Sequence, residues 1–223
     1  QVQSRAHGPI NQKLIDADIQ KIKDLYRRAG HGLSSVSARI APLPNGKQDL
    51  VFTINEGGKT GIQEINFHGN RVYGNYRLKT VMTSTEYNWL SWLKTTDVYD
   101  PDRIASDIEL VRRFYLKNGY ADFRVVSQEA RFDAAKGGWV IDISVDEGER
   151  YTVSDVRVES HLRGVESDAL QRVVTTSAGS TYNAEAVERS LQNITTEVMR
   201  RGHAFAQVRP RGERDASGRT VRV

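Results

Sequence analysis

The side chains that most often carry out chemistry in proteins are present in this chain, but their spacing supports neither a reaction nor a metal site. The chain has 223 residues and no cysteine, which excludes disulfides, thiolate catalysis and cysteine-ligated zinc. Its five histidines do not follow the spacing of metal ligands. These histidines are His7, His31, His68, His161 and His203. We therefore expect no catalytic residue, no metal ion and no other cofactor.

Two short patterns resemble parts of sites and are better explained by turns. A carboxylate recurs in Glu56-Gly57 and Glu147-Gly148, and each pair follows a run of alternating apolar residues. Gly137-Gly138 lies between two such runs, which is typical of a hairpin turn and not of a phosphate-binding loop. The chain is therefore expected not to be an enzyme.

The charge distribution argues against nucleic acid as a partner. The net charge is +4, but the segment from Arg200 to Val223 has seven arginines against Glu213 and Asp215 and carries +5. The remaining residues therefore sum to −1 and offer no basic face. No run approaches the roughly 18 apolar residues of a membrane helix, and Gln1–Arg5 does not begin an apolar signal sequence.

The elements that must position any site come in three copies. Apolar residues recur at i, i+4, i+7 and i+11 in three stretches, which predicts three helices of about four turns. The three stripes are Ile15, Ile19, Ile22 and Tyr26; Ile104, Ile108, Val111 and Tyr115; and Val187, Leu191, Ile194 and Val198. A helix-stop glycine follows each stripe, at Gly30, Gly119 and Gly202. The N-caps are Asn11, Asp100 and Asn183.

Each helix-stop glycine is followed by the pattern of a β-hairpin. A valine lies six residues after each glycine, at Val36, Val125 and Val208. Turn-forming residues come next, at 45–46, 136–138 and 216–218. The strands after the first two turns alternate apolar and polar residues over 50–55 and 141–146. His31 and His203 occupy the same position as Tyr120, which indicates a structural role for these side chains.

A further strand and a short helix precede the second and third long helices. The strands are expected at 62–67 and 151–158, and the short helices at 75–83 and 167–175. One unit is thus strand, helix, helix, strand, strand, an α+β layer. We expect a partial unit at 1–59 that lacks its first strand and helix, a complete unit at 60–148, and a unit at 149–223 that lacks its C-terminal end. The joins at 57–61 and 148–150 are short, so we expect restricted hinges.

The ordered recurrence of these motifs resembles the POTRA repeats of outer-membrane assembly proteins. It rests on Ile62-x-x-Ile65-x-x-x-Gly69-Asn70, on Arg112-Arg113-Phe114-Tyr115 with Gly119-Tyr120-Ala121, and on Asn55-Glu56-Gly57 with Asp146-Glu147-Gly148. Ser160-His161 departs from the expected Gly-Asn. The likeness covers essentially the whole chain, in the register of repeats two to four of the five in the assembly factor for outer-membrane β-barrels. It implies two helices packed on a three-stranded mixed sheet in each repeat.

The resemblance also implies a function. Such repeats lie in the periplasm and are attached to a C-terminal outer-membrane barrel that is absent from this chain. They would receive unfolded outer-membrane proteins and dock accessory lipoproteins. The alternative is the POTRA array of a related transporter, TamA-like or of the two-partner secretion type, which recognises dedicated clients.

In this family the last strand of a repeat lies in the centre of the sheet, and the strand after the long helix lies at an edge. An edge exposes backbone N–H and C=O groups with which another strand can pair. We therefore expect the partner- and client-binding edge in the complete repeat. Its residues are Phe123, Arg124, Val125, Val126, Ser127, Gln128, Glu129 and Ala130.

The parity of apolar residues changes along this strand. Phe123 and Val125 share one parity, while Ala130 and Phe132 share the other, which predicts a β-bulge within 127–129. The bulge either belongs to a docking site or only turns the edge away from aggregation. The sequence leaves both interpretations open.

A second candidate contact lies between the short and long helices of the complete repeat. Trp89 and Trp92 are separated by two residues in the stretch Trp89-Leu90-Ser91-Trp92-Leu93, which is expected to be a loop. Paired aromatic side chains in a loop can anchor a partner. The alternative is that both pack against their own repeat or its neighbour.

Overall fold

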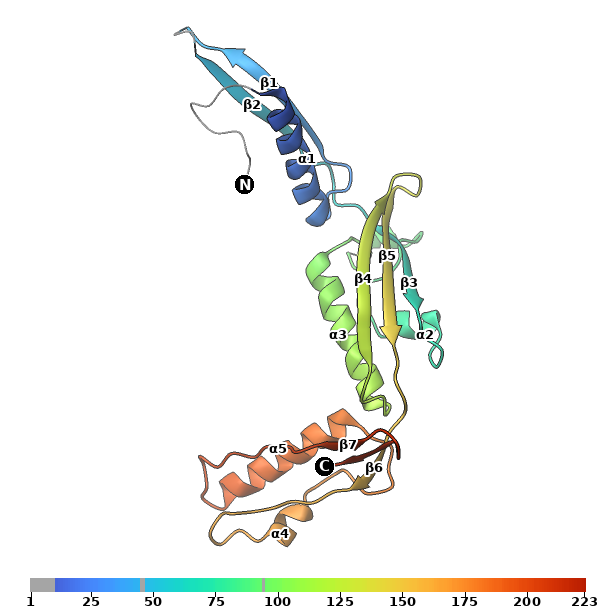
Figure 1. Ribbon diagram of the computed structural model, residues 1–223, viewed down its shortest axis with the longest axis vertical. Coiled ribbons are helices and arrows are strands. Elements are labelled where there is room, and N and C mark those ends of the chain that lie inside the picture. Colours follow the sequence, from blue (N-terminus) through green and yellow to red (C-terminus); the bar gives the residue numbers. More distant parts are fainter. Residues whose placement is uncertain (1–10, 45–46, 94) are drawn as a thin grey trace. The chain divides into compact units, whose positions relative to one another are not determined.

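The computed structural model describes residues 11–44, 47–93 and 95–223, without the side chain of Trp92 (Figure 1). The expected turn at Asn45-Gly46 lies outside these residues. The elements in chain order are α1 (Gln12–Arg28), β1 (Ser35–Pro42), β2 (Gln48–Asn55), β3 (Ile62–His68), α2 (Asn75–Lys79), the 3-10 helix η1 (Ser91–Leu93), α3 (Pro101–Lys117), β4 (Arg124–Asp133), β5 (Gly138–Asp146), β6 (Thr152–Asp155), α4 (Ser167–Gln171), α5 (Ala184–Arg200), β7 (Glu213–Asp215) and β8 (Thr220–Arg222).

Three sheets carry the strands of the three expected repeats. Their strand orders are β1-β2, β3-β5-β4 and β6-β8-β7. In the third sheet β6 and β8 are parallel and β7 and β8 are antiparallel. The arrowheads of β3 and β5 point the same way in Figure 1. The predicted α+β fold with mixed three-stranded sheets is confirmed.

The three long helices begin at caps that the sequence predicts. The Asn11 side chain accepts a hydrogen bond from the Lys13 backbone N–H, and the Asn183 side chain accepts one from the Ala186 N–H. Asp100 Oδ1 accepts from the Asp102 N–H at 3.0 Å. These bonds satisfy donors that have no partner inside a helix.

By its contacts the chain divides into two compact units. One takes in residues up to Phe67 together with 75–107 and 127–143, and the other comprises 68–74, 108–126 and 144–223. The strands of the middle sheet contribute to both units. The core of the middle repeat consists of fully buried side chains. They are Ile62, Ile65, Leu78, Ile104, Val111, Tyr115, Val140, Ile141 and Ile143.

The two short helices are shorter than the sequence predicts. The α2 helix ends at Lys79 instead of 83, and α4 ends at Gln171 instead of 175. The following backbone N–H groups bond to side chains of the long helices. Asp107 accepts from Thr83 and Ser84, and Ser190 Oγ accepts from Thr175 at 2.9 Å. A helical extension would have to give up these bonds.

The third repeat departs from the predicted strands. Only 152–155 of the expected strand 151–158 forms β6, and Val208 lies outside any strand because β7 begins at Glu213. Strand β8 has three residues and pairs with Glu213–Asp215. The segment around Val208 therefore receives no hydrogen bonds from β8. Val208 instead packs on the core formed by Val165, Leu170, Ile194 and Val198.

Candidate partner-binding edge

Strand β4 is at an edge of the middle sheet, because β5 separates it from β3. Residues 124–130 of the predicted binding edge lie in this strand. Phe123 lies just before it and is 3% exposed. Its ring stacks on the buried ring of Tyr115, with centroids 4.1 Å apart. Phe123 therefore anchors the start of β4 in the core and does not itself form an accessible surface.

The centre of β4 is open to solvent. Val126, Ser127, Gln128 and Glu129 are exposed, and the Val126 side chain is 63% exposed. Since successive side chains of a strand point to opposite faces, both faces of β4 are uncovered here. A second chain could therefore approach this stretch without displacing a covering side chain.

The burial pattern of β4 changes parity across its open centre. Val125 is half-buried before it, and Ala130 and Phe132 are half-buried after it. The change falls at 126–129, where the sequence predicts a bulge. The bulge at 127–129 stays a prediction.

Ion pairs balance the charge of β4 without covering its edge. Arg124 donates to Asp146 Oδ2 from Nε at 3.0 Å and from Nη2 at 2.7 Å. These bonds, together with one from the Gly148 N–H, lower the pKa of Asp146. Arg131 lies 3.8 Å from Asp142. Because the arginines are more than half exposed, solvent screens both pairs and neither contributes much to stability.

The turn after β4 is held by one carboxylate. Asp133 Oδ1 accepts from the Ala135 N–H at 3.0 Å and from the Lys136 N–H at 3.2 Å. These backbone bonds, that from Lys136 first, lower the pKa of Asp133. Lys136 also pairs with Glu64 of β3. The far end of the β4–β5 hairpin is thereby fixed relative to the third strand.

The loop that contains Trp89 is exposed and has an internally bonded backbone. Trp89 is 82% exposed and Leu93 is 64% exposed. The Asn88 N–H donates to Ser91 Oγ at 2.8 Å, and the Leu90 N–H donates to Asn88 Oδ1 at 3.0 Å. Trp92 lies in η1, and its side chain is outside the described part. Burying this loop against a partner would leave these amides bonded.

Sequence reasoning missed the role of Glu147. Its carboxylate is buried and accepts from the Arg71 N–H at 2.8 Å, the Val72 N–H and the Tyr115 hydroxyl at 2.7 Å. Burial and the bond to Glu147 raise the pKa of Tyr115. The carboxylate thus joins the loop after β3 to helix α3 and to the end of β5.

A sequence signal for this cluster existed. Tyr26 and Glu56 recur at the register of Tyr115 and Glu147, and the Tyr26 hydroxyl donates to Glu56 at 3.1 Å. Because each glutamate lies in a repeated Glu-Gly turn, the turn alone seemed to explain it. Its hydrogen bond to the tyrosine that ends the helix stripe was therefore not predicted. Sequence reasoning also missed Asp107 and Ser190. Here the signal was their equivalent position, because each lies three residues after the first residue of its helix stripe.

Surface cavities lie over the third-repeat core and beside β4. One, of about 570 Å³, lies over the third-repeat core and is lined both by apolar residues such as Leu191 and Val208 and by charged ones such as Arg157 and Arg211. The other, of about 420 Å³, is bordered by Ala130 and Phe132 of β4 and by Trp139. Nowhere in the described chain do three His, Cys, Asp or Glu side chains form a metal-binding group. Among the helices of residues 11–44, 47–93 and 95–223, none is long and apolar enough to cross a membrane.

Comparisons with known proteins match this architecture. Curated relatives include the outer membrane protein assembly factor BamA of Neisseria meningitidis serogroup B, 27% identical over 211 residues, which are 95% of this chain and 26% of the relative. BamA of Neorickettsia risticii is 30% identical over 205 residues, 92% of this chain and 28% of the relative. The chain thus spans about a quarter of the length of these relatives.

A solved structure and a family model agree on the fold. The crystal structure of Haemophilus influenzae BamA POTRA3-5 has a TM-score of 0.53 and 20% identity, over 97% of this chain and 82% of that chain. The POTRA family model, described as a surface antigen variable number repeat, matches residues 1–57, 60–148 and 151–223. Since these matches take in nearly the whole sequence, the chain belongs to the POTRA family.

Proposed function

We propose that this chain is part of a periplasmic scaffold that receives unfolded outer-membrane β-barrel proteins and docks accessory lipoproteins during outer-membrane protein assembly. A client strand would add to the free edge of β4. The POTRA family and the BamA relatives support the role in assembly. The observation that carries the mechanism is the edge position of β4, with four consecutive exposed residues at its centre.

Strand addition suits clients of different sequence. Backbone N–H and C=O groups give the same hydrogen bonds whatever side chains the client carries. Each bond contributes about 0.5–1.5 kcal/mol, so a few of them give only weak binding. Weak binding would let the client leave for the next step of assembly. Strand addition would thus bind a client without holding it permanently.

Proline substitutions test this mechanism. Along β4 alternate backbone N–H groups point toward β5 and toward the free edge, and proline removes the donor. We expect single prolines within 124–128 to form two alternating sets. One set should destabilise the sheet, and the other should leave the fold intact while weakening client binding. Circular dichroism measures the fold, and titration with a labelled peptide from a barrel strand measures binding.

A side-chain variant at the same edge is the matched control. Val126→Thr keeps the backbone donor and a β-branched side chain, so it should bind the peptide like the parent chain. If every folded proline variant also binds like the parent, strand addition to β4 is excluded. A panel of unrelated barrel strands tests the transporter alternative, because dedicated recognition would retain one client and reject the others.

A further inference from the structure

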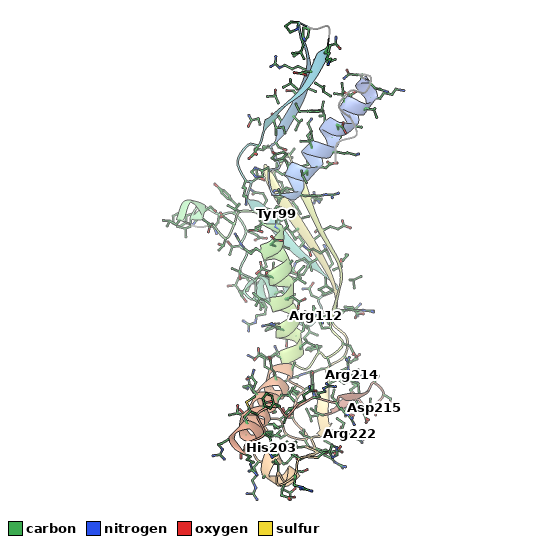
Figure 2. The ribbon with its side chains drawn as sticks, turned by 90° about the vertical axis from the view of Figure 1, so that its left-hand side faces the viewer. Tyr99, Arg112, His203, Arg214, Asp215 and Arg222 are labelled. Carbon is green, nitrogen blue, oxygen red and sulfur yellow. The ribbon has the colours of Figure 1, made fainter. Side chains whose placement is uncertain are left out.

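Two backbone hydrogen bonds tie the end of one long helix to the beginning of the next. The Thr60 N–H donates to the carbonyl of the helix-stop residue Gly30 at 3.3 Å. The Thr60 carbonyl in turn accepts from the Tyr99 N–H at 3.1 Å. Tyr99 directly precedes Asp100, the N-cap of α3, and lies near the start of that helix in Figure 2. We call Gly30, Thr60 and Tyr99 the first joint.

The same arrangement recurs at the next join, within the other compact unit. The Tyr151 N–H donates to the Gly119 carbonyl at 2.9 Å, and the Tyr151 carbonyl accepts from the Tyr182 N–H at 3.0 Å. Tyr182 directly precedes Asn183, the N-cap of α5. We call Gly119, Tyr151 and Tyr182 the second joint. Two joins with different side chains thus share one backbone design.

The glycines of the joints meet a second requirement besides helix termination. Gly30, Gly119 and Gly202 all have positive φ, at +93°, +102° and +92°. A Cβ on Gly30 would lie 2.9 Å from the Tyr99 carbonyl oxygen, and one on Gly119 would lie 2.8 Å from Thr181 Cγ2 and 3.3 Å from the Tyr151 carbonyl oxygen. Among the described residues, nothing lies within 4 Å of a Cβ on Gly202. Only the first two glycines therefore pack against a following segment.

The linkers also return to these glycines in the same way. The Gly57 N–H donates to Asn55 Oδ1 at 3.1 Å, and the Gly148 N–H donates to Asp146 Oδ1 at 3.3 Å. A Cβ on Gly57 would lie 3.3 Å from the Leu33 carbonyl oxygen, three residues after Gly30. A Cβ on Gly148 would likewise lie 3.1 Å from Asp122 Cβ, three residues after Gly119. Each linker is thus turned by an Asx bond and lies close to the segment that follows the preceding long helix.

Side chains reinforce the second joint. Asp122 accepts from the Tyr151 hydroxyl and from Arg214 Nη1, each at 2.5 Å. The bond from Tyr151, followed by that from Arg214, lowers the pKa of Asp122. Arg214 lies in β7 and is labelled in Figure 2. Lys117 of α3 also pairs with Glu185 of α5 at 2.8 Å.

We infer that each joint is a coupling element, in which the helix-stop glycine and one linker residue transmit order from the end of one long helix to the N-cap of the next. Stability would then be shared between neighbouring repeats through their backbones, as expected of a tandem array. The inference does not depend on client binding, because it concerns how the array holds itself together. It also explains why the joints keep their backbone bonds while their side chains differ.

Asparagine substitutions separate coupling from helix termination. Asparagine tolerates positive φ better than other non-glycine residues, so any remaining cost of that conformation is common to all three sites. In Gly30→Asn the new Cβ would collide with the Tyr99 carbonyl oxygen, and in Gly119→Asn it would collide with the Thr181 side chain and crowd the Tyr151 carbonyl oxygen. Gly202→Asn is the matched control. Hydrogen exchange of the full chain, followed by NMR, measures the joint amides, which are Thr60, Tyr99, Tyr151 and Tyr182.

We expect exchange of the two amides of the affected joint to accelerate about tenfold or more, since their hydrogen bonds must open for exchange. The control should leave all four joint amides unchanged. If Gly30→Asn and Gly119→Asn accelerate these amides no more than Gly202→Asn does, the glycines only end helices and the inference is overturned. The parent chain gives a second test that does not depend on variant folding. Thr60 and Tyr99 should respond to added urea as one opening unit, and separate openings would contradict coupling.

Discussion

At the scale of single residues, the repeats are held by buried polar side chains that accept backbone N–H groups. Glu147, Asp107 and Ser190 each bond to a segment that lacks a partner in regular secondary structure. A buried N–H without an acceptor is costly, so these side chains fix loops that apolar packing alone would leave undefined. They act through the loops they hold and do not reach the proposed binding edge.

Glu147→Gln should destabilise the chain more than the same change at the equivalent Glu56. The Glu147 carboxylate accepts two backbone N–H groups and the Tyr115 hydroxyl, and an amide would replace one acceptor oxygen with a donor. We expect a loss of about 1–3 kcal/mol in the free energy of unfolding, measured in urea.

Glu56 is the matched control because it accepts a tyrosine hydroxyl as Glu147 does, but at an exposed position. It accepts the Tyr26 hydroxyl but is exposed, so Glu56→Gln should cost about 0.5 kcal/mol or less. Equal losses at the two positions would refute the role assigned to burial of Glu147.

At the scale of elements, the sequence predicts the parts whose signals are local. The long helices follow from their apolar stripes, caps and stop glycines, and α3 begins at Pro101, directly after the predicted N-cap Asp100. Short elements are less predictable because remote acceptors decide their ends, as Asp107 does after α2. Val208 illustrates the same limit. Its sequence favours a strand, but a strand also requires a partner, and β8 pairs only with β7 and β6.

The edge position of β4 was expected from the resemblance to POTRA repeats and not from the strand's own residues. Strand order is a long-range property, and an apolar pattern whose parity changes between Val125 and Ala130 does not by itself distinguish an edge strand from a central one. The exposure of Trp89 was beyond sequence analysis for a similar reason. A tryptophan in a loop can pack or protrude depending on which neighbours the fold supplies.

Acrylamide quenching of tryptophan fluorescence should distinguish the Trp89 loop from the core. Trp89 is 82% exposed, whereas Trp139 is 4% exposed and stacks on Tyr99 with centroids 4.2 Å apart. In a Trp92→Phe background, which leaves Trp89 and Trp139 as the remaining tryptophans, we expect Trp89→Phe to remove the strongly quenched part of the emission. Trp139→Phe is the matched control and should remove a weakly quenched part. If Trp89→Phe in this background is quenched as strongly as Trp92→Phe alone, Trp89 is not an accessible contact.

At the scale of the whole chain, buried apolar side chains are unevenly distributed among the repeats. In the described first repeat, two strands form the sheet and Ile15 and Val36 are its buried apolar side chains. The middle repeat has a central strand with Val140, Ile141 and Ile143 almost fully buried. The third has a smaller core beside a cavity of about 570 Å³. The joints would connect these unequal parts, so a repeat with a small core could be stabilised by its neighbour.

Native-state hydrogen exchange should therefore rank the sheets. Amides of β5 are expected to exchange most slowly, because the central strand of the most buried sheet opens only with the middle repeat. Amides of β1 and β2 should exchange about tenfold faster or more, since a two-stranded sheet with little burial is marginally stable. In Gly30→Asn this gap should widen if the first joint transmits order to the first hairpin, and Gly202→Asn should leave it as in the parent. Equal protection of β2 and β5 in the parent chain would mean that the three repeats unfold as one unit.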